Sequence, residues 1–113
     1  MSLIVFLGSA MLCLDTQCFP ALVGKDTPTG TFDLHRRYVE SEGYGGDVLQ
    51  FLETPDSVYA IHRVWLGAPN QRRVALLRHS RPAQRRAITA GCVNVMPEIY
   101  ERLLSEKSVE IRP

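Results

Sequence analysis

The chain has 113 residues, of which 45% are hydrophobic and 22% are charged, and its net charge at pH 7 is +1. This length allows one domain, 1–113, and excludes a second. The composition is that of an ordinary globular domain, which can bury a core without disulfides or a structural metal, and the small net charge alone indicates no class of partner.

Short strands are predicted along most of the chain, because β-branched and aromatic runs alternate with turn residues. The predicted strands span residues 3–7, 11–15, 18–24, 31–39, 47–54, 58–65, 87–95 and 108–113. The clearest helix is predicted at 96–107, where Pro97 suits the first turn and Ile99, Leu103 and Leu104 form an apolar stripe. We therefore expect a mainly β, antiparallel sandwich or barrel-like domain with one main α-helix near the C-terminus.

The apolar N-terminus, residues 1–14, resembles part of a signal peptide. No basic residue precedes its apolar stretch, as a signal peptide would require. The stretch is also too short and too interrupted to span a membrane. We therefore predict a buried first strand and no membrane span.

Seven of the 13 basic residues lie between Asp56 and Glu98, in a stretch that contains no Asp or Glu. These seven are Arg63, Arg72, Arg73, Arg78, Arg81, Arg85 and Arg86. Residues 67–87 within the stretch are predicted to form a long basic connection. Such a segment is either a solvated loop or a surface suited to anionic ligands such as carboxylates or phosphates.

The chain contains three cysteines, Cys13, Cys18 and Cys92. Cys13 and Cys18 fall in a predicted hairpin, where they are either two small residues or, in an oxidising compartment, a disulfide. There is no paired Cys-x-x-Cys motif of the kind that binds zinc, so we predict no metal site.

Cys92 is the odd cysteine, and its surroundings allow two interpretations. An isolated cysteine in an apolar run is commonly a small buried hydrophobic residue. A nucleophilic cysteine instead needs a nearby base or a positive field. Gly91 permits a sharp turn that presents N–H groups to an oxyanion. A predicted helix and the basic segment flank Cys92, and both favour an anion there. His62 ends a strand-like run. These features favour a reactive thiol.

Three motifs in this order resemble the L,D-transpeptidase catalytic domain family, also called YkuD-like. They are TPTGTF at 27–32, VYAIH at 58–62 and TAGCVN at 89–94. The resemblance covers nearly the whole chain. It implies that Cys92 is the acyl-accepting nucleophile and that His62 is the base that takes its proton.

The resemblance also implies the roles of the residues around Cys92. Gly91 and Cys92 would offer backbone N–H groups to the oxyanion, and Thr89 and Asn94 would hold the loop in shape. We expect Thr89, Asn94 and Tyr59 to bind substrate. We expect the same of Arg85 and Arg86, because an arginine-rich loop suits a ligand rich in carboxylates. His79 is a competing base within the basic segment, and His35 is expected to have no role.

Two features depart from the family pattern. Ala90 stands where the family's motif usually carries a histidine, so substrate contacts or thiolate stabilisation are expected to differ. The 26 residues between His62 and Thr89 exceed the usual spacing. We therefore expect the basic segment to loop out as an insertion that forms a lid or a specificity wall.

The reaction that the resemblance implies is acyl transfer between two peptidoglycan peptide stems, a donor and an acceptor, through a thioester on Cys92. No cofactor is expected, and the implied location is the cell envelope or periplasm. The same residues would serve an L,D-carboxypeptidase, a D-amino-acid exchange enzyme or a delivered cell-wall toxin.

A prediction from another class is a non-catalytic polyanion-binding module that uses the Arg-rich loop 63–86. Salt-dependent binding to a nucleic acid would support such a module. No aromatic residue lies between Arg72 and Arg86, so platforms for stacking bases are missing and we predict no nucleic-acid partner.

Overall fold

The computed structural model describes residues 2–39, 46–64 and 72–113. The elements within these ranges are β1 (Leu3–Phe6), β2 (Met11–Leu14), β3 (Gln17–Pro20), β4 (Gly30–Asp33), β5 (His35–Tyr38), β6 (Asp47–Glu53), β7 (Val58–Arg63), α1 (Arg73–His79), α2 (Pro82–Arg85), β8 (Val93–Val95), α3 (Pro97–Glu101) and β9 (Ser108–Arg112). The end of the predicted strand 58–65 and the start of the predicted connection 67–87 lie outside the described residues. No helix in the described ranges is long and apolar enough to cross a membrane.

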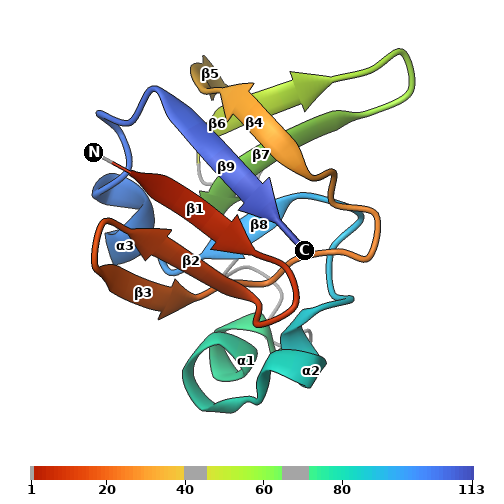
Figure 1. Ribbon diagram of the computed structural model, residues 1–113, viewed down its shortest axis with the longest axis vertical. Helices are drawn as coiled ribbons and strands as arrows, with labels where there is room; N and C mark the ends of the chain where they lie inside the picture. Colours follow the sequence, from red (N-terminus) through yellow and green to blue (C-terminus); the bar gives the residue numbers. More distant parts are fainter. Residues whose placement is uncertain (1, 40–45, 65–71) are drawn as a thin grey trace.

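The strands form two sheets that pack against each other (Figure 1). The five-stranded sheet has the order β3-β2-β1-β9-β4, and the four-stranded sheet has the order β5-β6-β7-β8. The prediction of a mainly β fold is confirmed. Most neighbouring strands are antiparallel, but β1 pairs with β9 and β7 pairs with β8 in parallel. The long connection between β7 and β8, which contains α1 and α2, returns the chain to the starting end of β7 and so permits the parallel pair.

The predicted strand 31–39 is in fact two strands in different sheets. β4 pairs with β9 in the five-stranded sheet, whereas β5 pairs with β6 in the four-stranded sheet. At Leu34, between β4 and β5, the backbone N–H donates to the Lys107 carbonyl oxygen at 2.9 Å. The chain therefore changes sheets at Leu34 without a Gly or Pro that would mark the change in sequence.

The helix near the C-terminus is shorter than the predicted span 96–107. After Glu101 the chain continues in tighter turns, in which each N–H donates three residues back: Leu103 to Tyr100 and Glu106 to Leu103, both at 2.9 Å. These turns still bury Tyr100 and Leu103 against the core. Residues of the predicted apolar stripe therefore pack against the core, although the α-helix spans only Pro97–Glu101.

The core lies between the two sheets. Val5, Leu12 and Ile111 enter it from the five-stranded sheet, and Leu49 and Ile61 enter it from the four-stranded sheet. Because side chains alternate along a strand, the residues next to Leu49 and Ile61 face the opposite side of the four-stranded sheet. That side carries the candidate site.

Asp47, at the start of β6, is a buried carboxylate that joins several elements. It accepts hydrogen bonds from Arg36 Nε at 2.9 Å, Arg63 Nη1 at 2.7 Å and the Tyr100 hydroxyl at 3.1 Å. Burial alone would raise the pKa of Asp47, but the hydrogen bonds from Arg63, Arg36 and Tyr100 outweigh it and lower the pKa. The ionised carboxylate therefore stabilises the fold at neutral pH.

Replacing Asp47 by asparagine is expected to lower the free energy of unfolding at pH 7 by about 2–3 kcal/mol, because an amide N–H₂ would face donor groups. The pKa of Asp47 is lower in the folded chain than in the unfolded chain. Its contribution is therefore lost as the pH falls through the folded-state pKa, and the difference between the two proteins should narrow in acid. Denaturant unfolding at pH 7 and in acid measures this, with the exposed Asp33→Asn as control. Equal stability at pH 7 would contradict the prediction.

Candidate active site

A pocket of about 330 Å³ lies on the side of the four-stranded sheet that faces away from the core. We call it the thiol pocket. It is lined by Arg37, Tyr38, Val39, Val48, Gln50, Glu53, Val58, Ala60 and Cys92. Its floor comes from alternate residues of neighbouring strands, such as Gln50 and Ala60, which are paired in the register of β6 and β7. Cys92 therefore borders a hollow that could hold a small substrate group.

Cys92 is half-buried at the edge of this pocket, directly before β8. Its Sγ lies 3.9 Å from the Val58 carbonyl oxygen, to which the thiol donates. Burial raises the pKa of the Cys92 thiol, and a hydrogen bond from the Ala60 backbone only partly offsets this. The resting group is thus a protonated thiol, not the thiolate that the positive flanks of the sequence indicate.

His62 lies two residues beyond Ala60 on β7 and therefore faces the same side of the sheet as the thiol pocket. It is 5% exposed and is paired in register with Asn94 of β8. Nδ1 lies 2.8 Å from the Arg63 carbonyl oxygen, and Nε2 lies 3.1 Å from Asn94 Nδ2. Ile61 pairs with Val93 in register, so Cys92 lies across from Ala60, and His62 lies two residues further along the same sheet face. His62 does not itself line the thiol pocket.

Burial lowers the pKa of His62, the hydrogen bond to the Arg63 carbonyl raises it, and the positive charge of Arg73 lowers it further. The net shift is downward, so the ring is neutral at physiological pH. A neutral imidazole can accept a proton, as a general base must. At rest the site therefore holds a neutral thiol and a neutral imidazole on the same sheet face.

Alkylation of Cys92 by iodoacetamide is expected to be slow at pH 7 and to accelerate with pH, about tenfold per unit, until the pH passes the raised pKa of the thiol. Iodoacetamide modifies the Cys92 thiol and not Cys13 or Cys18, because those two are joined in a disulfide. Rates followed by intact mass between pH 6 and pH 10, with a cysteine peptide as reference, measure the shift. A midpoint below that of the peptide would contradict a burial-raised pKa.

The loop before Cys92 is fixed by two threonines. The Thr89 hydroxyl donates to the Cys92 carbonyl oxygen at 2.6 Å and accepts from the Gly91 N–H at 3.1 Å. The Thr27 hydroxyl donates to the Gly91 carbonyl oxygen at 2.9 Å and accepts from the Gly24 N–H at 3.0 Å. The Gly91 N–H is therefore engaged within the loop at rest. This leaves the N–H of Cys92 as the backbone donor that we consider for an oxyanion.

Gly91 has a φ of +132°, a conformation that residues with a Cβ rarely adopt. A Cβ at this position would lie 2.4 Å from Cε1 of Tyr59. Tyr59 packs against the core and lies 6.3 Å from Phe51, ring centroid to ring centroid. The structure thus places Tyr59 beneath the loop rather than in the thiol pocket, and its predicted contact with substrate stays a prediction.

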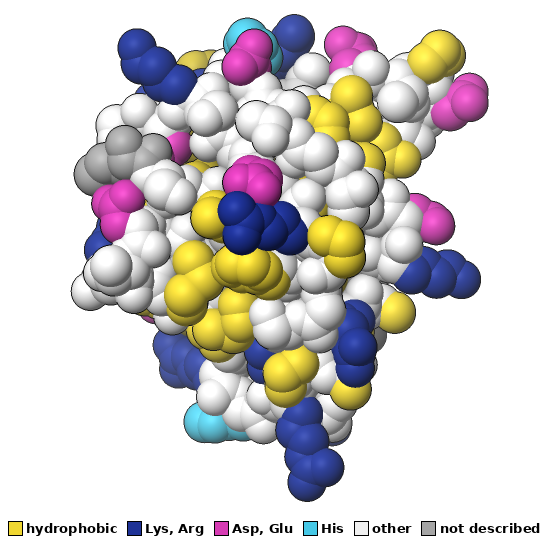
Figure 2. All heavy atoms as spheres, in the orientation of Figure 1, with side chains coloured by type: hydrophobic (Ala, Val, Ile, Leu, Met, Phe, Trp, Pro, Cys, Tyr) yellow, Lys and Arg dark blue, Asp and Glu magenta, His cyan; other side chains and the backbone are white. Residues whose placement is uncertain are grey.

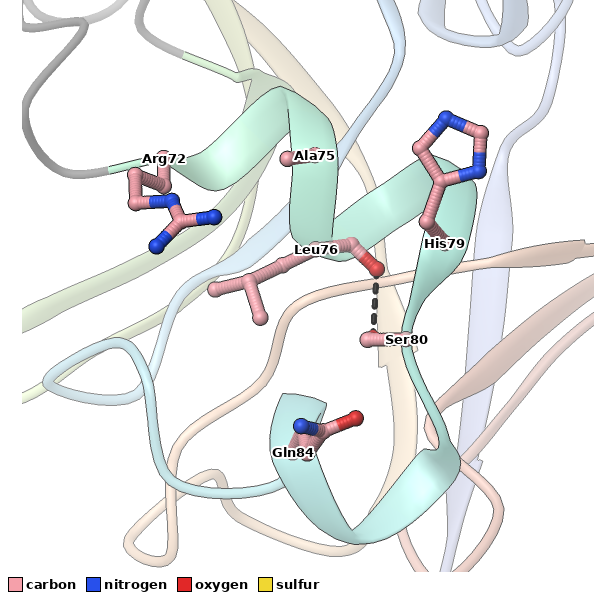
Figure 3. Close-up of a pocket in the computed structure, with 6 residues that line it drawn as sticks. All are labelled: Arg72, Ala75, Leu76, His79, Ser80 and Gln84. Atoms are coloured by element: carbon pink, nitrogen blue, oxygen red, sulfur yellow. Dashed lines mark hydrogen bonds between the residues drawn. The ribbon is translucent and has the colours of Figure 1, made fainter.

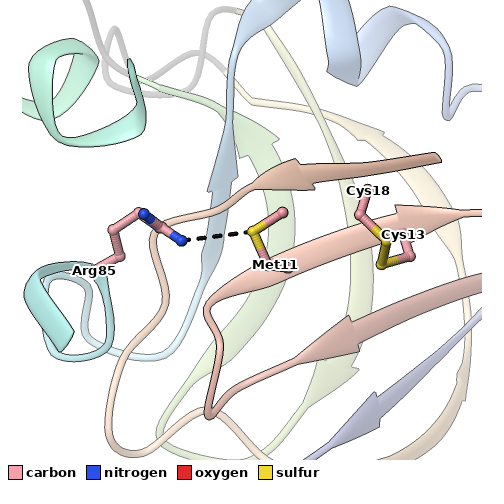
Figure 4. Close-up of a disulfide and its surroundings, with 4 residues drawn as sticks. All are labelled: Met11, Cys13, Cys18 and Arg85. Carbon is pink, nitrogen blue, oxygen red and sulfur yellow. Dashed lines mark hydrogen bonds between the residues drawn. A yellow bond between two sulfur atoms is a disulfide. The ribbon is translucent and has the colours of Figure 1, made fainter. Parts of the chain in front are cut away.

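Arg85 and Arg86, the two arginines predicted to bind substrate, lie in different surroundings. Arg85 is buried, and its guanidinium donates to the carbonyl oxygens of Ala10 at 3.2 Å, Ser80 at 2.8 Å and Ser9 at 3.1 Å. Figure 4 shows Arg85 extending from α2 toward Met11 of β2. These bonds make Arg85 a structural link between α2 and the β1–β2 hairpin. Arg86 is exposed, and its role stays a prediction.

The basic segment folds into α1 and α2, where the sequence predicts only a connection with a helical turn. Lys and Arg side chains, without Asp or Glu among them, gather over this lower part of the molecule in Figure 2. His79, at the end of α1, lines a separate cavity of about 360 Å³ with Arg72, Ser80 and Gln84 (Figure 3). Neither His79 nor the exposed His35 lines the thiol pocket.

Arg73 is a residue of the candidate site that the sequence pattern did not indicate. From the start of α1, its Nη1 donates to Asn94 Oδ1 at 2.8 Å, next to His62. No local pattern distinguishes Arg73 from the other arginines of the segment. The pocket-lining residues of β6 and β7 were also missed, although the alternation that places Ala60 beside His62 could have indicated them. Within the described residues, no group of three or more His, Cys, Asp or Glu side chains could hold a metal ion.

No protein-family model matches the sequence, and a search of curated proteins also finds no match. Solved structures match in fold. The L,D-transpeptidase from Xylanimonas cellulosilytica DSM 15894 matches with a TM-score of 0.59 and 16% identity over 97% of this chain and 59% of that chain. L,D-transpeptidase 1 of Mycobacterium tuberculosis matches with a TM-score of 0.54 and 13% identity over 98% of this chain and 58% of that chain.

The chain therefore has the fold of the L,D-transpeptidase catalytic domain, as the three motifs imply. At these identities the likeness shows the fold, and what the chain does must be argued from its own residues. The chain also spans less than two thirds of the length of each of these two proteins.

Proposed function

We propose that this chain is a cysteine-dependent acyl transferase of the L,D-transpeptidase type, which acts on peptidoglycan peptide stems through a thioester on Cys92. The observation that carries the proposal is the half-buried thiol at the edge of the thiol pocket, with the His62 imidazole on the same sheet face. The matched fold supports the substrate class, since both solved structures described above are L,D-transpeptidases.

The reaction begins when the Cys92 thiol, which donates to the Val58 carbonyl oxygen at rest, turns toward His62 and passes its proton to Nε2, the ring nitrogen that carries the lone pair. The Asn94 N–H that donates to Nε2 at rest is displaced as this nitrogen is protonated. The sulfur attacks the peptide carbonyl, and the Cys92 N–H stabilises the oxyanion. The imidazolium then returns the proton to the leaving amine, and a thioester remains until an amine or water resolves it.

The nature of the acceptor decides between cross-linking, trimming and exchange. An amine from a second stem gives a cross-link, water gives a carboxypeptidase product, and a free D-amino acid gives an exchanged stem. All three outcomes use the same residues, so a delivered toxin with this site would also use them. We propose cross-linking or remodelling of stems as the activity.

We also propose that the chain works in the cell envelope or periplasm. Cys13 and Cys18 lie opposite each other in the register of β2 and β3 and form a disulfide (Figure 4). Disulfides persist in oxidising compartments and are rare in the cytosol. The disulfide therefore supports a location outside the reducing cytosol.

Polyanion binding is the weaker proposal for the basic segment. Two of its arginines are committed to internal hydrogen bonds, Arg85 to main-chain carbonyls and Arg73 to Asn94. Such side chains are not available to hold a polyanion without breaking contacts within the fold.

Incubation with synthetic tetrapeptide stems, followed by mass spectrometry of the products, tests the proposal. We expect cross-linked dimers that have lost one terminal D-residue, or trimmed and exchanged stems if water or a free D-amino acid is the better acceptor. The absence of all three products, together with salt-dependent binding to a polyanion, would overturn the proposal in favour of a binding module.

A further inference from the structure

Three side chains from three elements form a continuous hydrogen-bonded row that ends at the imidazole. Arg73 Nη1 of α1 lies 2.8 Å from Asn94 Oδ1 of β8, and Asn94 Nδ2 lies 3.1 Å from His62 Nε2 of β7. On the other side of the ring, Nδ1 lies 2.8 Å from the Arg63 carbonyl oxygen. The row connects the basic insertion to the proposed base.

The Arg73 guanidinium at one end of the row and the Arg63 carbonyl at the other determine where the hydrogen atoms between them lie. A guanidinium has only donors, so the Asn94 atom that faces Arg73 must be the amide oxygen. The Asn94 amide nitrogen then faces His62 and donates, so Nε2 must carry a lone pair. The remaining ring proton lies on Nδ1, where it donates to the carbonyl oxygen of Arg63. The ring is therefore neutral and in one tautomer.

Burial makes this arrangement hard to exchange. Asn94 is fully buried and His62 is nearly so, so an amide that rotated would leave buried polar atoms facing the wrong partners. If Arg73 were absent, Asn94 could turn its oxygen toward the ring, where it would accept a proton from a doubly protonated imidazole. The orientation of Asn94 thus selects between the neutral and the charged ring.

We infer that Arg73 is a positioning residue that holds His62, through Asn94, as a neutral imidazole with its lone pair on Nε2. The inference deepens the proposed function and rests on it for its catalytic meaning. It makes the insertion between base and nucleophile a working part of the site, since α1 supplies the group that keeps the resting base neutral. The Asn94 N–H must leave Nε2 before the ring takes the proton of the thiol. The state of the ring itself can be measured without any turnover.

Other charged groups near β7 act on the ring less directly. Arg63, the next residue on β7, pairs its guanidinium with Asp47 of β6 and Glu101 of α3. Two further carboxylates lie on neighbouring elements, Glu53 at the far end of β6 and Glu98 on α3. Cys92 directly precedes β8 and is protonated at rest. Among these described groups, Arg73 is the one with a side-chain hydrogen-bonded path to Nε2.

The test is a ¹⁵N NMR titration of the histidine ring nitrogens in the whole chain, assigned with His62→Gln. Three variants are compared with the wild type: Arg73→Met, which keeps the stem and removes the donors; Arg73→Lys, which keeps a donor-only cation; and Arg78→Met, the same change on an exposed residue of α1. Thermal unfolding followed by circular dichroism confirms that each variant is folded at the temperature of the titration.

We expect the wild type to show the Nδ1–H tautomer, with protonation of His62 only at a pH below that of an ordinary imidazole. Arg73→Met should shift this protonation to higher pH, Arg73→Lys should restore it toward the wild-type value, and Arg78→Met should leave it unchanged. An unchanged His62 titration in Arg73→Met would overturn the inference, as would an Nε2–H tautomer in the wild type.

Activity separates this inference from the proposed function. In the stem assay, Arg73→Met should lose more activity at pH 6 than at pH 8, because protonation of the base is greater at the lower pH. An inactive wild type with the predicted NMR behaviour would refute the function and leave the role of Arg73 intact. An active wild type with no change in Arg73→Met would refute the role of Arg73 alone.

Discussion

Replacing Cys92 by serine is expected to abolish stem processing, with a loss on the order of 10⁴-fold or more, as for nucleophiles of other covalent enzymes. A hydroxyl at this position would have a far higher pKa than the thiol and would lack the activating field that a serine nucleophile needs. The substitution is nearly isosteric, so the fold should persist. Turnover of tetrapeptide stems, followed by chromatography, measures the effect.

His62→Ala gives the matched comparison. We expect a smaller loss of about 10²–10⁴-fold, because a general base accelerates a reaction that the nucleophile makes possible. His79→Ala is the control, since His79 lies in a separate cavity with Arg72 and Gln84. A larger loss in His79→Ala than in His62→Ala would show that the base has been misassigned.

Gly91→Ala is expected to lower the free energy of unfolding by about 3–5 kcal/mol and to remove activity with it. Two effects add up here. The φ of +132° strains any residue with a Cβ, and the new Cβ would lie 2.4 Å from Cε1 of Tyr59. The loop or the ring must move, and either movement displaces Cys92 from the pocket edge. Denaturant unfolding and stem turnover together measure the effect.

Gly46→Ala separates the two effects. Gly46 also has a positive φ, +112°, but no atom of the described residues lies within 4 Å of the position of its Cβ. It should therefore show the strain alone, about 1 kcal/mol. The double variant Gly91→Ala with Tyr59→Ala should lose less free energy of unfolding than the sum of the losses in the two single variants, because the contact is relieved. Strict additivity would contradict the proposed clash.

The motifs indicated which distant residues meet near Cys92 better than hydrophobic periodicity indicated the strands. Thr27, Thr89 and Gly91, which lie far apart in sequence, meet in one hydrogen-bonded loop. Periodicity could not reveal the change of sheets at Leu34, because both sheets present the same alternation to a common core. Nor could it reveal the parallel pair of β7 and β8, which depends on where the long connection returns the chain.

The protonation state of the site was not predictable from residue types. The positive flanks of Cys92 indicate a thiolate, but burial dominates and raises the pKa of the thiol. The interior position of Arg85 and the bond from Arg73 to Asn94 also follow from tertiary packing alone. A run of arginines looks uniform in sequence, yet its members differ in the fold. Arg85 links α2 to the β1–β2 hairpin, Arg73 contacts Asn94, and Arg86 is exposed.

The covalent intermediate provides the most direct test of the central claim. Incubation of the protein with a carbapenem or a tetrapeptide stem, followed by intact-mass measurement and peptide mapping, should locate one acyl adduct on Cys92. The adduct should be absent in Cys92→Ser and should form more slowly in His62→Ala. Processing of stems without any adduct on Cys92, or an adduct that persists in Cys92→Ser, would contradict the account.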